Sequence, residues 1–566
     1  MTSGGPARPG TVRDLQPAIS RLDRYVKLHM QAANTPGMAL ALTDRRGLLH
    51  LATYGYSDVA AQTPVTESTL FEIGSISKSF TSVALMQLME EGLVDLHQPV
   101  TRYLPWFEVQ SHHPPITLHH LLSHSAGIIR GMEFTGEARY EVWALRETQA
   151  TAPPGTYYHY SNVGYKTLGV ILEDVLGKPY GDILQERILD PLEMTQTEPV
   201  ITHDTRKRLA VGYEAFYDDR PTPQARPLAP ATWLEFRWGD GSVASTPADM
   251  AAYLRMYLNR GRGAGGTVLS EHGLGLMMEP VIEAAEEGRG GHYGYGLDIE
   301  ELDGHRVIGH GGGMVGYYAY ILADLQDGLG AVVLANGPGS GTDKIVRFAL
   351  QLLRAELHRG ELPPIPQVNP FAVAHAEQYA GSYRSVPGPS STPASQADQA
   401  TVDGTFRIAA EGGRLYLGIG NQRLPLERRE PDGFLVDHPE LARYLLGFGR
   451  DDGEVVEAYC GPDWYVNERY EGPRASDHPA EWAAYTGHYR SHNPWNTNFR
   501  VVLRKGELKL IYPSGEEKSL VPVDDGEFRV GEEEACPERI RFDVIVENQA
   551  LRANFSCGEY YRASKY

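Results

Sequence analysis

Ser75-Ile76-Ser77-Lys78 opens an amphipathic stretch, Phe80-Thr81-Ser82-Val83-Ala84-Leu85-Met86-Gln87-Leu88-Met89, which ends at Gly92. Residues three apart on a helix share a face, so the Ser75 hydroxyl and the Lys78 ammonium can meet in the first helical turn. A serine hydroxyl is a weak nucleophile, and a lysine can act as its base if burial lowers the lysine pKa. The free N–H groups of the helix N-terminus would face an oxyanion formed at Ser75. Because a Ser-x-x-Lys step is common by chance, its meaning depends on the motifs that follow.

Two further motifs follow this stretch along the chain. Tyr160-Ser161-Asn162 lies in a tyrosine-rich segment, and His310-Gly311-Gly312-Gly313 ends an apolar run typical of a strand. Ser-x-x-Lys, Tyr-x-Asn and His-x-Gly in this order resemble the serine β-lactamase/penicillin-binding-protein superfamily, over roughly residues 20–360. Similar flanking segments support the resemblance: residues 121–127, 239–246 and 293–297. The Tyr-x-Asn form resembles the class C branch, which includes D-aminopeptidases, D-alanyl-D-alanine carboxypeptidases and β-lactamase-like esterases.

The resemblance implies a role for each matching side chain. Ser75 would attack a carbonyl and become acylated, while Lys78 and Tyr160 would share the role of base. Asn162 would orient Lys78 and contact amide groups of the substrate. The sequence leaves open which of Lys78 and Tyr160 takes the first proton. We therefore expect a serine hydrolase that cleaves an amide in a small peptide or a D-amino-acid derivative through an acyl-enzyme, with no metal and no other cofactor.

The third motif departs from the pattern of the family. Members that act on β-lactams or on free C-terminal carboxylates usually carry Lys-Thr-Gly where this chain has His310-Gly311-Gly312. A permanent ammonium and a hydroxyl suit a carboxylate, whereas a mostly neutral histidine and a glycine do not. The departure favours an aminopeptidase, an amidase or an esterase over a D,D-carboxypeptidase or a β-lactamase.

The resemblance also implies where the substrate would bind. Gly312 would border the substrate, and the backbone N–H groups of Gly313 and Ser75 would form the oxyanion hole, where glycine allows close approach. His310 would position the substrate or the Tyr160 hydroxyl.

Other interpretations of the same residues stay open. A β-lactamase-like carboxylesterase would use them on an ester. A penicillin-binding sensor would be acylated without turnover, although the intact Lys78, Tyr160 and Asn162 argue against it. His120 and His124, in a cluster with His112, His113 and His119, have the i, i+4 spacing of metal ligands. No glutamate follows His120 as in zinc peptidases, so we expect a structural helix there and no metal site.

The chain divides into three predicted domains. Residues 1–16 are predicted to be a flexible tail, and residues 17–362 have a mixed α/β pattern. For the latter, the resemblance implies an α/β (α+β) domain with an antiparallel sheet and a helical subdomain. Prolines at 363, 364 and 366 indicate a linker. Beyond it, residues 379–385 are echoed by residues 485–491, each followed by short alternating strands. We expect two β-barrels, at 370–472 and 473–566, which resemble the lipocalin-like appendages of D-aminopeptidase relatives.

Local patterns predict several elements of the first domain. Thr246-Pro247-Ala248-Asp249 has the N-cap residue, the N1 proline and the N3 carboxylate of a helix start. Periodicity predicts two strand pairs and a closing helix: residues 38–43 with 49–56, residues 317–324 with 329–335, and residues 342–357.

Composition limits the classes of partner. The 566 residues carry a formal charge of −21, which argues against nucleic acid and anionic membranes. The N-terminus has no apolar segment of a secretory signal, and the three cysteines fit a reducing compartment, so we expect a cytoplasmic protein. The expected partner is a small-molecule or short-peptide substrate, and the sequence does not decide between a monomer and a homo-oligomer.

The barrels have two competing interpretations. Two acidic loops, residues 524–527 and 531–536, could reach the active site and hold a free amine of the substrate with their carboxylates. Alternatively, the barrels only mediate assembly.

Overall fold

The computed structural model describes residues 15–131, 137–224, 226–284, 291–387, 404–439 and 441–563. Most of the expected tail, residues 1–14, lies outside these ranges. The first described helix, α1 (Gln16–Ala33), begins at the end of the expected tail. Among the described residues, no helix combines the length and the apolar character needed to cross a bilayer.

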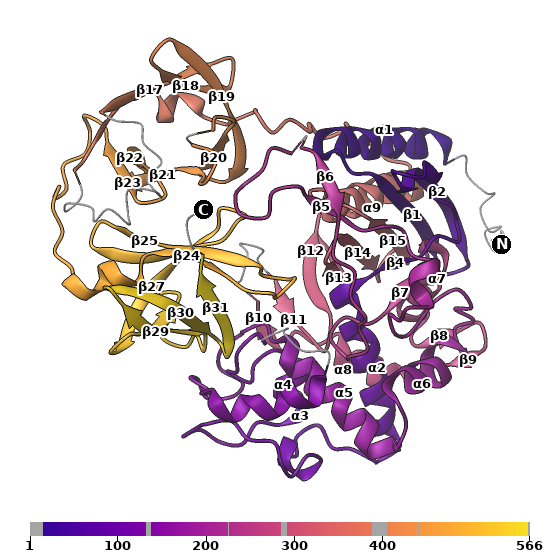
Figure 1. The fold of residues 1–566 in the computed structure, drawn as a ribbon. Coiled ribbons are helices and arrows are strands. Elements are labelled where there is room, and N and C mark those ends of the chain that lie inside the picture. Colours follow the sequence, from indigo (N-terminus) through magenta and orange to yellow (C-terminus); the bar gives the residue numbers. More distant parts are fainter. Residues whose placement is uncertain are drawn as a thin grey trace, which may run out of the picture.

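An antiparallel sheet forms the centre of the first domain (Figure 1). Within the described ranges it has nine strands in the order β10-β11-β12-β13-β14-β15-β1-β2-β3. Their bounds are β10 (Ile282–Glu283), β11 (His292–Tyr293), β12 (Asp298–Leu302), β13 (His305–Met314), β14 (Tyr317–Asp324), β15 (Leu329–Ala335), β1 (Gly37–Asp44), β2 (Leu48–Asp58) and β3 (Thr63–Pro64). Both predicted strand pairs are therefore confirmed.

Two aspartates build the turns of these hairpins. The Asp44 carboxylate accepts hydrogen bonds from the N–H groups of Arg46 (2.7 Å) and Gly47 (3.0 Å), between β1 and β2. The Asp324 carboxylate accepts hydrogen bonds from the second and third N–H groups after it in the turn to β15, at 2.9 and 3.0 Å. Such side-chain-to-backbone bonds stabilise a reversal of the chain, so each hairpin is encoded locally.

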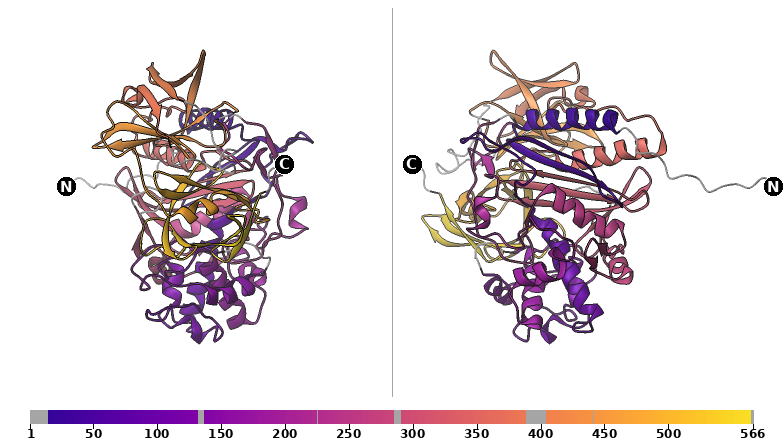
Figure 2. Two further views of the ribbon diagram at one scale, coloured as in Figure 1. Left: turned by 60° about the vertical axis from the view of Figure 1, so that its left-hand side comes forward. Right: turned by 90° about the vertical axis from the view of Figure 1, so that its right-hand side faces the viewer.

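Helices cover both faces of the sheet. Helices α1 and α9 (Thr342–His358) lie on one face, and α7 (Pro247–Leu258) lies on the other (Figure 2). Side chains of β1 alternate accordingly, since Met38 and Leu40 pack with α1 and α9 whereas Ala39 and Ala41 face the opposite core. The Thr246 hydroxyl caps α7 by accepting a hydrogen bond from the Asp249 N–H, as predicted.

A helical region adjoins the α7 face of the sheet and carries most of the motif residues (Figure 1). The α-helices of this region include α2 (Ser77–Glu90), α3 (Leu118–Leu122), α4 (Ala138–Ala144), α5 (Asn162–Leu176), α6 (Tyr180–Leu184) and α8 (Glu271–Met277).

Two closed antiparallel barrels of eight strands follow, within the part of the chain that the structure describes. The first barrel comprises β16 (Gly381–Ser385), β17 (Thr405–Glu411), β18 (Arg414–Ile419), β19 (Gln422–Glu430), β20 (Gly433–Val436), β21 (Leu446–Asp451), β22 (Glu454–Cys460) and β23 (Asp463–Val466). The second comprises β24 (Gly487–Arg490), β25 (Asn498–Arg504), β26 (Glu507–Ile511), β27 (Glu517–Asp524), β28 (Glu527–Val530), β29 (Arg539–Val546), β30 (Gln549–Phe555) and β31 (Gly558–Arg562). Each is a meander closed by pairing of its first and last strands.

The sequence repeat occupies the same place in both barrels. The buried Tyr383 donates a hydrogen bond to the carbonyl of Tyr379 (2.9 Å), and the buried Tyr489 donates one to the carbonyl of Tyr485 (2.8 Å). In each case the acceptor ends a short 3₁₀ helix that precedes the first strand. The repeated tyrosines therefore fasten this helix to the barrel core.

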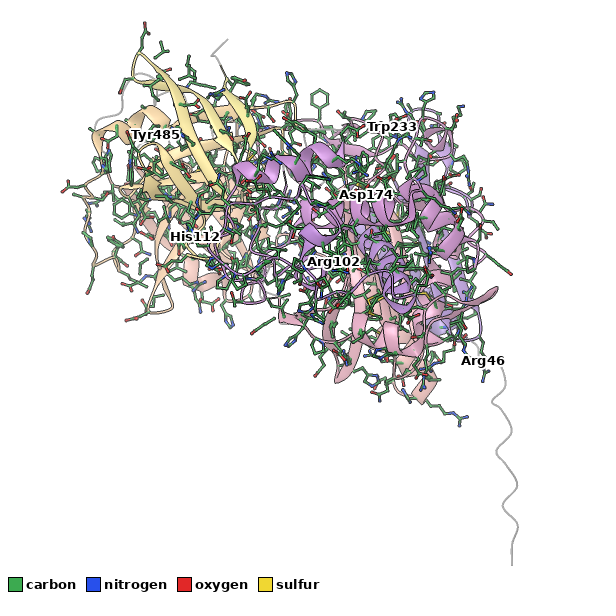
Figure 3. All side chains as sticks on the ribbon, turned by 90° about the horizontal axis from the view of Figure 1, so that it is seen from below. Arg46, Arg102, His112, Asp174, Trp233 and Tyr485 are labelled. Atoms are coloured by element: carbon green, nitrogen blue, oxygen red, sulfur yellow. The ribbon has the colours of Figure 1, made fainter. Side chains whose placement is uncertain are left out.

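The second barrel lies against the first domain as well as against the first barrel. Val502 and Ile511 join the apolar core of the first barrel. On the other side, Arg490 pairs with Asp218, and the Asn498 amide donates to the Asp218 carbonyl at 2.9 Å. Seen from below, the second barrel, which contains Tyr485, lies beside the helical region (Figure 3).

Candidate active site

Ser75 and Lys78 meet as the sequence predicted, with one difference in local structure. Ser75 lies in a 3₁₀ turn, Gly74–Ile76, and α2 begins only at Ser77. The fully buried Lys78 Nζ donates to Ser75 Oγ (3.0 Å) and to the carbonyl of Asp240 (2.9 Å). The lysine is thus held against the serine hydroxyl by a backbone acceptor from another part of the domain.

Tyr160 completes a contact triangle with these two residues. Its hydroxyl lies close enough to Ser75 for the serine to affect the tyrosine pKa, and Lys78 Nζ lies 4.8 Å from the centre of the Tyr160 ring. Withdrawal of the hydroxyl from water raises the pKa of Tyr160 well above its usual range, and the opposing effects of Ser75 and the Arg130 charge are smaller. The Tyr160 hydroxyl is therefore protonated and neutral in this site.

A buried histidine supports Tyr160 and the start of α5. Ser161 caps α5 by accepting a hydrogen bond from the Gly164 N–H (3.1 Å), and its own N–H donates to His124 Nδ1 (3.0 Å). The His124 ring lies 4.2 Å from the Tyr160 ring, centre to centre. Burial, followed by the Lys78 charge, lowers the pKa of His124 well below its usual range, so the ring that contacts Tyr160 is neutral. The largely buried Asn162 is the first residue of α5.

His310 is neutral, and both of its ring nitrogens are occupied. Nδ1 lies 2.5 Å from the carbonyl oxygen of Gly311, which can only accept, so Nδ1 carries the proton. Nε2 then accepts a hydrogen bond from the Tyr293 hydroxyl at 3.0 Å. Burial and then the Lys78 charge lower the pKa of His310 to about 3. The His310 and Tyr160 rings lie 6.3 Å apart, centre to centre.

The glycines after His310 bring β13 against the turn that carries Ser75. A Cβ atom on Gly312 would lie 1.9 Å from the carbonyl oxygen of Ile73, so a side chain has no room there. A Cβ atom on Gly74, which has a φ of +52°, would lie 2.7 Å from the Gly313 nitrogen. A Cβ atom on Gly313 itself would meet nothing within 4 Å. The two expected oxyanion donors, Ser75 and Gly313, therefore belong to backbone segments in direct contact, beside open space.

A buried charge cluster lies behind Lys78 and was not predicted. Lys166 Nζ lies 2.7 Å from a carboxylate oxygen of Glu141 in α4 and 4.0 Å from one of Asp240. These three side chains are at most 5 % exposed. Asp240 is also the residue whose carbonyl accepts from Lys78. In the sequence, a lysine at position 166 precedes the apolar run of residues 168–172.

The second barrel also contributes to the surroundings of Tyr160. The carbonyl of Ala535, in one of the two predicted loops, accepts a hydrogen bond from Thr151 Oγ1 (2.6 Å). Three residues later, Glu538 Oε1 accepts from the Arg130 N–H (2.7 Å) and from His159 Nε2 (2.9 Å). In the other predicted loop, the Gly526 carbonyl accepts from the N–H of Phe542 within the same barrel. Glu538 itself was missed, because its partners lie far away in the sequence.

Histidines with metal-like spacing have other partners. His120 Nδ1 is hydrogen-bonded to Thr117, while His124 Nδ1 accepts from Ser161. Among the described residues, one group, His305, Asp324 and Asp327, brings three metal-ligating atoms within 4.8 Å of one another. The Asp324 oxygen of this group already accepts a 2.6 Å hydrogen bond from Arg354, which indicates an ion-pair network between β14 and α9.

Comparisons with known proteins identify the family of the chain. The beta-lactamase family model matches residues 22–356. Penicillin-binding protein 4 of Amycolatopsis lactamdurans is 30% identical over 352 residues, which cover 60% of this chain and 89% of the relative. The putative beta-lactamase-like 1 of Homo sapiens is 27% identical over 382 residues, which cover 63% and 74% of the two chains.

Solved structures give the same result. The octameric penicillin-binding protein homologue from Pyrococcus abyssi superposes with a TM-score of 0.56 at 26% identity, covering 79% of this chain and all of that one. D-amino acid amidase from Ochrobactrum anthropi SV3, in complex with L-phenylalanine amide, has a TM-score of 0.51 at 27% identity and covers 61% of this chain and all of its own. The chain therefore belongs to the beta-lactamase family, within the β-lactamase/penicillin-binding-protein superfamily of serine hydrolases.

Proposed function

We propose that the protein is an amidase of the aminopeptidase type, which cleaves a small peptide or a D-amino-acid derivative through an acyl-enzyme on Ser75. The observation that carries this proposal is the contact of Ser75 with both Lys78 and Tyr160, beside a neutral His310. Ser75, Lys78 and Tyr160 form a nucleophile with two proton carriers. His310 adds no permanent positive charge that could pair with a substrate carboxylate.

The geometry supports a division of the proton transfers between Lys78 and Tyr160. Because burial keeps Tyr160 protonated in the free site, we assign the role of base to Lys78, which accepts the Ser75 proton as Oγ attacks the carbonyl once its own ammonium has lost a proton. The N–H groups of Ser75 and Gly313 hold the oxyanion of the tetrahedral intermediate. As the C–N bond breaks, Tyr160 gives its proton to the leaving amine and regains one from Lys78. Water then attacks the acyl-enzyme and gives a proton to Lys78, which returns it to Ser75 Oγ as the C–O bond to the serine breaks and the acid product is released.

The proposed substrate class is based on the third motif, which has no permanent positive charge to bind a substrate carboxylate. With a pKa of about 3, His310 remains uncharged at physiological pH and cannot pair with a carboxylate. A charge-assisted hydrogen bond contributes roughly 1.5–3 kcal/mol, so its loss should cost a carboxylate substrate about 10- to 100-fold in affinity. The neighbouring D-amino acid amidase, by its name, acts on an uncharged amide, which supports the same class here.

A comparison of matched substrates tests the proposal. We expect p-nitroanilides of D-amino acids to be cleaved with a kcat/KM well above that for a cephalosporin, and the Ser75→Ala variant serves as the blank. L-amino-acid anilides test the stereochemistry. A cephalosporin that rivals the best amide would overturn the proposal. Esters that are cleaved while every amide resists would establish the carboxylesterase instead.

Domain division and assembly are proposals of the same kind. Each barrel closes around an apolar cluster of its own, although Val502 and Ile511 of the second pack against that of the first, which supports domains at 17–362, 370–472 and 473–566. The neighbour from Pyrococcus abyssi is described as octameric, which supports a homo-oligomer here too. Light scattering of the full chain would test the homo-oligomer, since a mass of 62.5 kDa, that of one chain, would exclude it.

A further inference from the structure

The Glu538 carboxylate connects the second barrel to two segments that flank Tyr160. It follows β28 and lies next to the first residue of β29, and its side chain is 13 % exposed. Oε1 accepts hydrogen bonds from the Arg130 N–H at 2.7 Å and from His159 Nε2 at 2.9 Å, and Oε2 accepts one from the Ser556 hydroxyl. Burial alone would raise the pKa of Glu538, but the hydrogen bonds from His159, Ser556 and Arg130 outweigh it and lower the pKa.

Both residues that donate to Oε1 lie next to Tyr160, one in the sequence and one in space. His159 is the residue before Tyr160 in the chain. The Arg130 guanidinium lies 5.4 Å from the centre of the Tyr160 ring. In addition, the Arg130 carbonyl accepts a 3.0 Å hydrogen bond from the Val163 N–H in the first turn of α5. One carboxylate therefore anchors the backbone on which α5 begins and the side chain next to Tyr160.

We infer that Glu538 is a positioning residue, supplied by the second barrel, that holds Tyr160 in line with Ser75 for proton transfer to the leaving group. This inference rests on the proposed function, in which Tyr160 protonates the leaving amine. Displacement of a catalytic group by about 1 Å can cost on the order of 100-fold in rate. The second barrel is then required for a complete active site and is more than an assembly module.

Two other roles for Glu538 fit the contacts less well. A free amine of the substrate would have to displace the donors on Oε1 and Oε2, so Glu538 is poorly suited to bind it. A role in docking alone is also insufficient, because contacts elsewhere join the two domains. Examples are the hydrogen bond from Thr151 to the Ala535 carbonyl and the ion pair between Arg490 and Asp218.

The leaving group of the substrate provides the decisive test in the full-length protein. A p-nitrophenolate leaves without protonation, whereas an alkoxide or an amine needs a proton from Tyr160. We therefore expect Glu538→Ala to lower kcat for an alkyl ester or amide by about 10- to 100-fold. For a p-nitrophenyl ester of the same acyl group, we expect less than a threefold change. Tyr160→Phe should show the same selectivity more strongly.

Three variants make the test specific. Glu538→Gln can keep its oxygen on Arg130 and His159 while its amide donates to Ser556, so it should retain most of the activity. Thr151→Val removes a contact between the same two domains without touching the partners of Glu538, and it should leave the leaving-group ratio unchanged. If Glu538→Ala does not fold, Glu538→Asp displaces the carboxylate by one methylene and should show the same selectivity.

Different outcomes would contradict the role of Glu538 and the role of Tyr160. Equal losses for both leaving groups in Glu538→Ala and Glu538→Asp, or a selective loss in Thr151→Val, would overturn the positioning role. If Tyr160→Phe itself shows no dependence on the leaving group, the proposed role of Tyr160 fails, and the inference about Glu538 falls with it.

Discussion

Lys166 offers a quantitative test of the buried network behind the nucleophile. Its ammonium is fully buried and lies 2.7 Å from the equally buried Glu141 carboxylate. Lys166→Met keeps the length and the apolar stem of the side chain but leaves the Glu141 charge without this partner. Removing one partner of a buried ion pair costs roughly 3–5 kcal/mol, because a charge remains uncompensated in a medium of low polarity. With an unfolding entropy of about 2.1 cal/mol/K per residue, this should lower the Tm of a domain of this size by about 4–7 °C.

A second variant separates the charge from the packing. In Lys166→Met/Glu141→Leu both charges are replaced by apolar groups, which is commonly neutral or stabilising for a buried pair. We expect calorimetry to show that most of the lost stability returns in this double variant. A single variant as stable as the wild type would refute the ion pair. A double variant that is no more stable than Lys166→Met would show that the cost comes from packing.

Two further predictions concern buried groups near the nucleophile. His310→Asn should lower kcat/KM by about 10- to 1000-fold with folding intact. Because the pKa of His310 is about 3, the ratio of wild-type to variant kcat/KM should stay constant between pH 5 and pH 8. A ratio that changes with a pKa near 6.5 would contradict the neutral ring. Burial raises the pKa of the Glu72 carboxyl group to about 8. The folded state therefore holds a proton that the unfolded state releases above pH 4.5. For this reason, the contribution of Glu72 to wild-type stability should fall between about pH 4.5 and pH 8. The Tm of Glu72→Gln should therefore rise relative to that of the wild type over this interval, and a difference that does not vary with pH would refute the assignment.

The parts of the fold that local chemistry specifies were predictable from the sequence. The hairpin of β1 and β2, the cap at Thr246 and helix α9 each depend on residues close together in the chain. The repeated tyrosines predicted two equivalent barrels, because the same residue makes the same core contact twice. For the family, three ordered motifs were sufficient, and the comparisons confirm it.

The features that the sequence did not predict depend on contacts between distant segments. Ser75 was expected in the first turn of a helix, but the close approach of Gly74 to Gly313 shapes a 3₁₀ turn there instead. The partner of Lys166 is 25 residues away, and that of Arg130 is 408 residues away. No periodic pattern or short motif reports such pairs, so the sequence alone identified neither the partner of the buried lysine nor the role of the glutamate between two strands.

The identity of the nucleophile is the central claim, and covalent labelling tests it most directly. Mass spectrometry after treatment with an active-site phosphonate should place one label on Ser75. Ser77 and Ser79 are matched controls, because the Ser77 hydroxyl accepts a hydrogen bond from the Val243 N–H and the Ser79 hydroxyl donates one to the Ile76 carbonyl. We expect Ser77→Ala and Ser79→Ala to be labelled like the wild type. Ser75→Ala should remain unlabelled and lose on the order of 10⁴-fold in rate. A phosphonate adduct that persists on Ser75→Ala would contradict the account.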